Sequence, residues 1–458
     1  MKWVRRTVNV LVLLAATNLA WSSMIIEAES GLRWDILGII WLLAFLFVNI
    51  RPIPKNGPTK RIWYLRSGAE LLRLFLITAT VNVLSVCAYF LCFRSVLFDY
   101  VYAGMFFRGI WALTIFNLMG LAVLEAVLFW NGMIRVYLTS VQLGVKHRVL
   151  AALCGWIPFL NIWYLTKIIR ITSEEAEFET EKWELDAARA ESEVCKTRYP
   201  LLMVHGVFFR DFRYINYWGR IPRELTRNGA TVYYGRQQSA ASVEDSGREL
   251  AARIRQIVEE TGCEKVNIIA HSKGGLDSRA AIAHCGMAPY VATLTTINTP
   301  HRGCIFAEYL LGKVPEAARQ KIASTYNAAL KRLGDEDPDF LAAVTDLTES
   351  ACLARNETTP DVPGVVYESV MSYCRKARHG KFPLNMTYPI VKHFDGLNDG
   401  LVSVESAKWG GKFTLLEPSG KRGISHGDVV DLNRENVKGF DVREFYVNLV
   451  ADLKQRGY

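Results

Sequence analysis

The stretch that most constrains the fold of this chain is residues 266–276, which read VNIIAHSKGGL. An apolar run is followed at once by a serine and by two glycines, an order typical of a buried strand that turns sharply into a helix with Ser272 at the turn. Ala270 and Gly274 stand two residues before and two residues after this serine, where only small side chains leave room for a tight turn. An ordinary turn that carries a serine would fit the same letters, so the flanking sequence is needed to interpret them.

Strand-like and helix-like segments alternate on both sides of this turn. Strict alternation predicts a parallel sheet with helices on both of its faces. The expected strands besides the one at 266–271 are 199–207, 230–234 and 291–297, and the expected helices are 218–227, 244–260, one from the serine turn to 283, and a final one at 442–453.

A serine hydroxyl needs a neighbouring base, and the base needs an acid that orients it. Of the eight histidines, His426 is the best candidate base, because it lies in a glycine-flanked loop after the best candidate acid and before the final helix. That acid is Asp399, on the turn Asn398-Asp399-Gly400 next to an apolar stretch. Asp395 is an alternative acid, and a purely turn-capping role is an alternative interpretation of Asp399.

Acyl chemistry at Ser272 also needs N–H donors for the oxyanion. By analogy with the position of this loop in α/β-hydrolases, the candidates are the backbone amides of Val207, which follows the strand-ending pair His205-Gly206, and of Lys273, which follows the serine. Phe208 and Phe209 are candidate substrate-binding residues, because they come directly after the same loop.

From about residue 199 to its end, the chain resembles the secreted bacterial triacylglycerol lipases of the α/β-hydrolase superfamily. The motifs that carry the resemblance are HG at 205–206, HSKGG at 271–275, TPHRG at 299–303 and NDGLV at 398–402. Ala270 departs from the first glycine of the family's G-x-S-x-G motif. The resemblance implies an α/β-hydrolase fold, ester hydrolysis through an acyl-enzyme on Ser272, a helical lid and often a structural calcium ion.

No cofactor is required for this chemistry, but the resemblance raises the question of calcium. Asp428 stands two residues after His426, as one metal-binding carboxylate does in these lipases. The matching upstream aspartate is absent, and Asp395 is the only nearby substitute. A role for Asp428 in bracing the histidine loop is the competing interpretation.

The lid has a place in the sequence, because about a hundred residues separate Ile297 from Asp399, far more than a connecting loop needs. Helical spacing of apolar residues at 306–311 and 323–333 favours a helical cover or additional core. We therefore expect a lid insertion at about 301–390 within a hydrolase domain at 198–458.

The first third of the chain has a different composition and predicts a membrane domain at 1–172 with about five spanning helices. The expected spans are Thr7–Ile26, Leu37–Ile50 extended back to Asp35, Leu71–Phe93, Ile110–Trp130 and Val149–Ile169, each near the ~20 residues that a span requires. The first segment has a signal-peptide interpretation as well, since Lys2, Arg5 and Arg6 precede it.

Charge supports this division. Residues 1–172 carry 17 Lys and Arg against 6 Asp and Glu, whereas the remaining residues carry 37 against 39. The excess positive charge is therefore beside the membrane, and nucleic acid need not be a partner. By the positive-inside rule the basic loops are cytoplasmic, so five spans would place the catalytic domain outside, on the plasma membrane. The fifth segment contains Gly155 and Pro158, and a re-entrant fifth segment would leave that domain in the cytoplasm.

Between the two domains, residues 173–197 are acidic and favour a solvated helical linker. Six cysteines follow at 195, 263, 285, 304, 352 and 374, so a Cys352–Cys374 disulfide and unpaired thiols are both open.

The sequence thus predicts an α-helical transmembrane domain followed by an α/β-hydrolase domain, acting as a membrane-anchored serine lipase or esterase on a lipid or other long-chain ester. The alternatives are an acyltransferase or thioesterase with the same residues, and a non-catalytic membrane scaffold.

Overall fold

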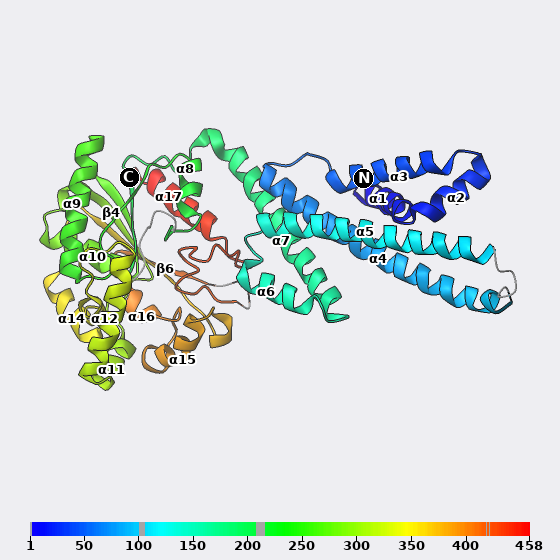
Figure 1. Ribbon diagram of the computed structural model, residues 1–458. Helices are drawn as coiled ribbons and strands as arrows, with labels where there is room; N and C mark the ends of the chain where they lie inside the picture. Colours follow the sequence, from blue (N-terminus) through cyan, green and yellow to red (C-terminus); the bar gives the residue numbers. More distant parts are fainter. Residues whose placement is uncertain (1, 100–105, 208–215, 418, 421) are drawn as a thin grey trace. The chain divides into compact units, whose positions relative to one another are not determined.

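The computed structural model describes residues 2–99, 106–207, 216–417, 419–420 and 422–458 (Figure 1). The chain divides into two compact units, Met1–Leu185 and Asp186–Tyr458. The division falls inside the segment expected as a linker. That segment is not solvated throughout, because Glu175 is buried and accepts hydrogen bonds from the side chains of Arg61 and Ser140.

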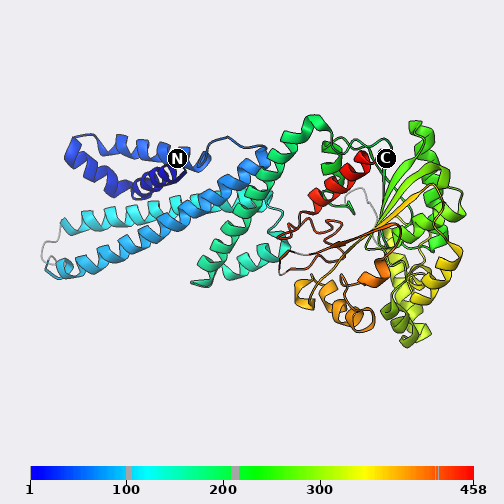
Figure 2. The ribbon, with the colours of Figure 1, turned by 180° about the vertical axis from the view of Figure 1, so that it is seen from behind.

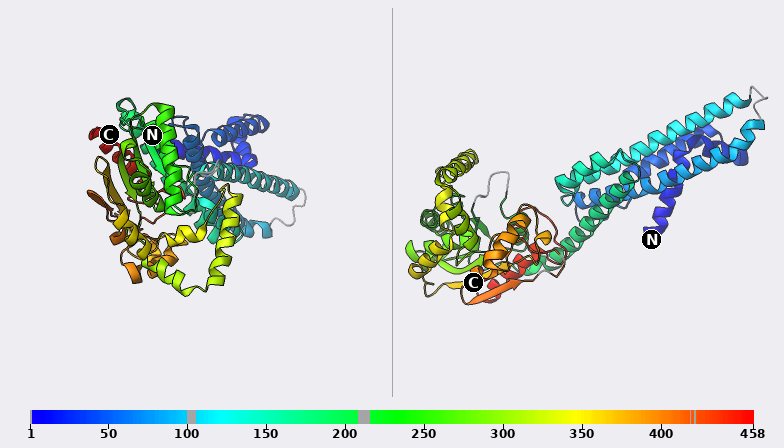
Figure 3. Two further views of the ribbon diagram at one scale, coloured as in Figure 1. Left: turned by 90° about the vertical axis from the view of Figure 1, so that its left-hand side faces the viewer. Right: turned by 90° about the horizontal axis from the view of Figure 1, so that it is seen from below.

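The first unit is helical. Its long helices α4 and α5 lie side by side in Figures 1 and 3, and they approach closely because two glycines face the neighbouring helix. A Cβ on Gly68 would lie 2.8 Å from the Cβ of Arg135, and one on Gly132 would lie 2.8 Å from Leu72. The helices of this part are α1 (Lys2–Thr17), α2 (Leu19–Ser30), α3 (Trp34–Ile50), α4 (Lys60–Asp99), α5 (Phe106–Thr139), α6 (Gly144–Cys154) and α7 (Leu160–Arg189), the last of which continues into the second unit.

Among the described residues, fewer helices than the expected five qualify as candidate spans. Within the described residues, Lys60–Tyr89 and Ala112–Thr139 are long and apolar enough to cross a membrane, and a third span results only if α1 and α2 count as one. The chain bends by 95° between α1 and α2, which breaks the first expected span. The fifth expected span is broken between α6 and α7, where glycine and proline interrupt the helix.

One acidic residue of α5 is satisfied inside the helical unit. Glu125 is buried and accepts hydrogen bonds from Thr78 Oγ1 at 3.1 Å and from Asn82 Nδ2 at 2.8 Å. Both donors lie on α4, so this polar contact holds the two long helices together.

The second unit contains a sheet of six strands in the order β2-β1-β3-β4-β5-β6, and every neighbouring pair is parallel. The strands are β1 (Leu201–Val204), β2 (Val232–Tyr234), β3 (Val266–His271), β4 (Val291–Ile297), β5 (Val366–Ser372) and β6 (Lys412–Leu416). The first four coincide with expected strands, and β5 and β6 were not expected.

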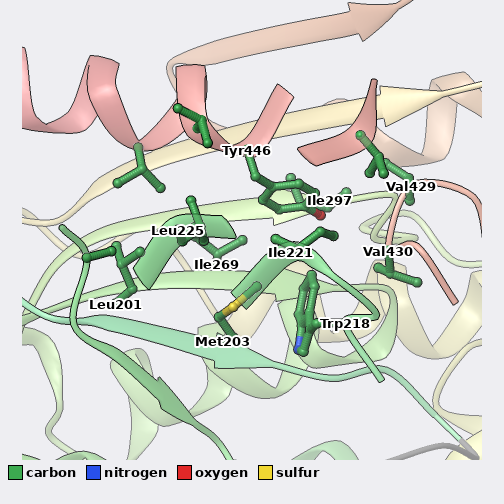
Figure 4. Close-up of a cluster of buried hydrophobic side chains, with 14 of the residues drawn as sticks. Leu201, Met203, Trp218, Ile221, Leu225, Ile269, Ile297, Val429, Val430 and Tyr446 are labelled. Atoms are coloured by element: carbon green, nitrogen blue, oxygen red, sulfur yellow. The ribbon is translucent and has the colours of Figure 1, made fainter. Parts of the chain in front are cut away.

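Helices cover both faces of this sheet. Figures 1 and 2 show α9 (Val243–Thr261) and α10 (Lys273–His284) on one face, with α8 (Ile221–Arg227) and α17 (Val442–Gln455) on the other. Successive side chains of β1 point to opposite faces of the sheet. Leu201 and Met203 belong to the hydrophobic core with α8 and α17, and Leu202 and Val204 belong to the core with α9. Figure 4 shows the first of these cores, where Trp218, Ile221 and Tyr446 meet the sheet.

Two groups of helices follow β4. The first, between β4 and β5, comprises α11 (Ile305–Lys313), α12 (Glu316–Arg332), α13 (Phe340–Thr345) and α14 (Glu349–Thr358), and the second, between β5 and β6, comprises α15 (Leu384–Asp395) and α16 (Val404–Ala407). The stretch 301–390, expected as one lid insertion, is therefore divided by β5, a strand within the sheet.

Candidate active site

Ser272 lies between the end of β3 and the start of α10, with φ 55° and ψ −131°. Residues other than glycine rarely adopt a positive φ, and the surrounding structure has to hold them there. The packing at this turn is close. A Cβ on Gly274 would stand 2.3 Å from the carbonyl oxygen of His205, and one on Gly275 would stand 2.2 Å from Oγ1 of Thr299. These two glycines therefore let α10 start directly behind the serine.

His426 and Asp399 are in contact. Nδ1 of His426 lies 2.7 Å from Oδ2 of Asp399, and the backbone N–H of His426 donates to the carbonyl oxygen of the same aspartate. The Asp399 side chain is fully buried, and its Oδ1 accepts from the backbone N–H groups of Leu401 and Val402 at 2.9 and 2.8 Å. With Oδ1 occupied by these donors, Oδ2 is the acceptor for the Nδ1–H of His426, which leaves Nε2 of His426 as the basic nitrogen.

Asn298 is a further partner of this carboxylate that the sequence reading missed. It follows β4, is fully buried, and donates from Nδ2 to Oδ2 of Asp399 at 2.6 Å. Its own orientation is held by Ser372, which donates its N–H to Oδ1 of Asn298 at 3.0 Å and accepts from Nδ2 at 2.7 Å. The backbone of Asn298 has a φ of 48°, in the left-handed region that asparagine tolerates. The sequence signal for this position is therefore only the presence of an asparagine directly after a strand.

A second histidine packs against the first. The rings of His271 and His426 have centroids 4.5 Å apart, and Nδ1 of His271 lies 2.6 Å from the hydroxyl of Tyr217. Burial, aided by the charge of His426, lowers the pKa of His271 well below its usual value. His271 is therefore neutral at physiological pH and adds no competing positive charge.

The expected oxyanion donors lie on either side of Ser272. Among the described residues, neither the N–H of Val207 nor that of Lys273 has a hydrogen-bond acceptor. Gly206 brings the first loop close, because a Cβ at that position would lie 2.9 Å from Cβ of Ser272. The Lys273 amide stands at the N-terminus of α10, where the helix dipole favours negative charge.

The side chain of Lys273 is turned away from this chemistry into a buried ion pair. Its Nζ lies 2.7 Å from Oδ1 of Asp277 and 3.0 Å from Oγ of Ser246, which belongs to α9. Burial raises the pKa of Asp277 to about 6, although Lys273 acts in the opposite direction. The hydrogen bond to Ser246 ties the first turn of α10 to α9.

Ser272 and His426 border the same cavity of about 590 Å³. The walls are mostly apolar and come from the helices after β4 and from the segment before α15. Val207 also lies on the wall, whereas Phe208 and Phe209 lie outside the described residues. The main apolar wall residues are Phe306, Leu310, Leu311, Phe340, Leu341, Val344, Phe382 and Leu384.

The calcium ligand that the resemblance implied does not fit a metal site. Oδ1 of Asp428 lies 2.7 Å from Nη2 of Arg422, and Oδ2 accepts from the N–H and the hydroxyl of Ser425. The guanidinium of Arg422 therefore occupies the position in which a metal ion would contact Asp428. In the described part of the chain no cluster of three or more His, Cys, Asp or Glu side chains is arranged for a metal ion. Asp428 instead braces the loop that carries His426.

The six cysteines of the second unit are free thiols, so the disulfide considered between Cys352 and Cys374 is not formed. Burial raises the pKa of Cys352 to about 11 and that of Cys374 to about 12. Both thiols therefore stay protonated and act as small core residues.

Comparison with known proteins points in one direction. The family described as "Putative serine esterase (DUF676)" matches residues 203–336. A triacylglycerol lipase of Burkholderia plantarii is 36% identical over 188 residues, which is 38% of this chain and 51% of that protein. A triacylglycerol lipase of Pseudarthrobacter phenanthrenivorans is 36% identical over 178 residues, 36% of this chain and 54% of that protein.

Among solved structures, the mature form of a Bacillus licheniformis lipase is 23% identical, with a TM-score of 0.41 over 55% of this chain and 91% of that one. The chain spans about half the length of the two triacylglycerol lipases named above. Their similarity and the matched esterase family support a lipase/esterase-type hydrolase.

Proposed function

We propose that residues 186–458 form a serine carboxylic ester hydrolase that acts on lipid esters. The observation that carries this proposal is the contact of His426 with the buried Asp399 at 2.7 Å, on the cavity that Ser272 also borders. An imidazole oriented by a carboxylate is what a serine hydroxyl needs to become a nucleophile at neutral pH. The similarity to triacylglycerol lipases supports the same chemistry.

In the proposed reaction, Oγ of Ser272 attacks the ester carbonyl carbon while its proton moves to Nε2 of His426. Asp399 keeps the Nδ1–H proton in place and stabilises the imidazolium. The N–H groups of Val207 and Lys273 hold the oxyanion. The ester C–O bond then breaks, and His426 returns the proton to the departing alcohol. Water repeats these steps on the acyl-enzyme and releases the acid and free Ser272.

The substrate class follows from the walls of the cavity. An apolar cavity of about 590 Å³ favours a long acyl chain over a short one. Several apolar side chains of α11 and α12 are exposed, including Tyr309, Leu310, Ile322 and Tyr326. We assign these two helices the role of a lid that opens on an apolar surface. Phospholipids and triacylglycerol both satisfy this description.

Membrane anchoring is the second part of the proposal. It rests on the two helices that are long and apolar enough to cross a bilayer, α4 and α5. An enzyme held at the bilayer keeps its site where lipid esters reside.

The two candidate spans also support a proposal for the side of the membrane. A chain that crosses and returns has both ends of the hairpin on one side. Arg51 and Lys55 precede α4, which begins at Lys60, and Lys146 and Arg148 follow α5, so the positive-inside rule assigns that side to the cytoplasm. We therefore propose a catalytic unit on the cytoplasmic side, the alternative to the outer location that five spans would give. Green fluorescent protein fused after Tyr458 should fluoresce and alkaline phosphatase should be inactive, and the reverse result refutes this topology.

The activity is tested with the full-length chain in detergent and a series of p-nitrophenyl esters from short to long acyl chains. We expect higher kcat/KM with the longer chains and loss of turnover in Ser272→Ala. Ser192→Ala is the matched control, because Ser192 is an exposed serine outside the cavity and outside the two lid helices. A fluorophosphonate probe should label the wild type and the control but not Ser272→Ala. Equal labelling of all three would refute the role of Ser272.

Assays on the same purified protein distinguish the hydrolase from the alternative functions, which are acyl transfer, thioester hydrolysis and a non-catalytic scaffold. An acyltransferase would form the acyl ester of an added alcohol faster than the free acid, and a thioesterase would prefer the matched thioester. A scaffold would bind lipid without reacting with the probe.

A further inference from the structure

The first unit contains a cavity of about 760 Å³ that the proposed hydrolase chemistry does not use. Three helices each contribute one stripe of side chains at helical spacing. These stripes are Lys2, Arg5 and Arg6 on α1, residues 66–73 on α4, and residues 173–181 on α7. The segment 52–56 completes the wall. We call this space the basic cavity.

Part of its charge is already neutralised within the wall. Nε and Nη2 of Arg6 each lie 2.6 Å from an oxygen of Glu70, and Arg73 lies 3.4 Å from the same carboxylate. Arg73 also donates to Oγ of Ser173 at 2.5 Å. These contacts fasten the three helices together, so the cavity is preformed rather than a gap between loose segments.

The remaining charges have no partners of opposite sign. In the part of the chain that the structure describes, Lys2, Arg5 and Arg66 make no ion pair, and Arg5 donates only to the carbonyl oxygen of Arg51. Glu177 and Glu181 on the opposite stripe likewise have no cation within 4.0 Å. Cations and carboxylates thus border one cavity without pairing with each other, and a ligand that carries both charges would satisfy both groups.

The position along the helices points to lipid. On α4 the wall residues 66–73 immediately precede the apolar part of a candidate span, and on α1 the exposed residues Trp3 and Val4 are adjacent in sequence to the wall residues Lys2 and Arg5. Basic residues and tryptophan at the end of a span are typical of the headgroup level of a bilayer.

From this arrangement we propose that the basic cavity binds the headgroup of an aminophospholipid, a phosphate diester joined to a primary ammonium. Arg5 and Arg66, with Lys2, contact the phosphate, for which guanidinium groups are suited. Glu177 and Glu181 accept hydrogen bonds from the ammonium. A primary ammonium has N–H donors and the quaternary ammonium of choline has none, so the carboxylates distinguish the two lipids. The membrane location rests on the proposed function, but the binding does not depend on hydrolysis.

The test uses the full-length chain carrying Ser272→Ala, so that the lipid is not consumed, in detergent micelles with fluorescent phosphatidylethanolamine. Unlabelled phosphatidylethanolamine, phosphatidylcholine and phosphatidylglycerol of equal chain length compete. We expect phosphatidylethanolamine to bind about tenfold more tightly than phosphatidylcholine, the difference expected from charge-assisted hydrogen bonds. Equal affinity for these two lipids would overturn the proposal.

Two variants separate the two halves of the cavity. Arg66→Gln should weaken binding of phosphatidylethanolamine and phosphatidylglycerol alike, by about tenfold. The double variant Glu177→Gln with Glu181→Gln should weaken only phosphatidylethanolamine. Lys146→Gln and Glu174→Gln are matched controls, because both residues are exposed and lie outside the cavity. Unchanged binding in Arg66→Gln would refute the phosphate contact.

Glycerophosphoethanolamine, which has the headgroup without acyl chains, distinguishes a lipid from a water-soluble phosphodiester. Weak competition by this compound supports a lipid ligand, and competition as strong as that of the lipid overturns it. Ester hydrolysis by the chain with intact Ser272 is measured separately, so a failure of lipid binding and a failure of the hydrolase proposal give different results.

Discussion

Replacement of Asp399 by asparagine tests the proposed catalytic group most sharply, because the hydrogen bonds around this side chain determine how an amide would sit. Oδ1 of Asp399 accepts from the N–H groups of Leu401 and Val402. The amide oxygen of Asp399→Asn must take that place, since two backbone donors face it. Its NH₂ group then takes the place of Oδ2 and faces His426 and Asn298.

Two consequences follow from that orientation. An NH₂ group facing Nδ1 of His426 makes Nδ1 an acceptor and moves the ring proton to Nε2, so that His426 can no longer take the proton of Ser272. The same NH₂ group meets Nδ2 of Asn298, which is 2.6 Å from that position in the wild type. Asn298 cannot turn over without losing the hydrogen bond from the N–H of Ser372.

We therefore expect kcat/KM for a long-chain ester to fall by about 10³–10⁴-fold. The free energy of unfolding should fall by about 1–3 kcal/mol, because two buried donors face each other without an acceptor. Activity is measured with the p-nitrophenyl ester, and stability by urea unfolding followed by tryptophan fluorescence.

Asp395→Asn is the matched control, because Asp395 was the alternative acid in the sequence and lies half-buried at the end of α15. It should keep activity within about threefold of wild type, since the hydrogen bonds that the structure describes for His426 go to Asp399 and not to Asp395. The assignment of the acid is wrong if Asp399→Asn keeps more than a tenth of the activity while Asp395→Asn loses it.

Three further predictions concern the surroundings of the site. Lys273→Met should destabilise the second unit by about 3–5 kcal/mol at pH 8, where the variant leaves the buried carboxylate of Asp277 unpaired. The loss should be smaller at pH 5, because the pKa of Asp277 is raised to about 6 and its carboxyl is protonated there. An equal loss of unfolding free energy at both pH values in chemical unfolding would contradict this. Gly274→Ala should lower stability by about 1–3 kcal/mol and reduce activity, because the new Cβ meets the carbonyl of His205, whereas Gly312→Ala meets nothing within 4 Å and should be neutral. Addition of a calcium chelator should leave the unfolding temperature unchanged, because Arg422 already neutralises Asp428. A lower unfolding temperature in the presence of the chelator would show that a metal site exists.

The sequence predicted those parts of the fold that depend on local patterns. The apolar runs of β1, β3 and β4 and the alternation with helices were sufficient for the parallel sheet. β5 was missed because it lies within the long stretch after Ile297, which was interpreted as lid, and β6 because its residues are only partly buried at the sheet edge. The five expected spans exceed the two or three candidate spans among the described residues, since a window of apolar residues does not register the 95° bend between α1 and α2.

In the candidate site, too, residues on local sequence patterns could be predicted and residues held by long-range contacts could not. Ser272, Asp399 and His426 could be proposed from the sequence because each stands on a turn whose glycine or polar neighbours are adjacent in the chain. Asn298 could not, because its contact with Asp399 joins residues 101 positions apart and depends on β5 lying next to β4. An asparagine after a strand is otherwise unremarkable turn chemistry. Sequence patterns therefore locate the groups proposed to react, and the sheet order determines which buried donors hold them, so variants of Asn298 test the fold and the proposed chemistry together.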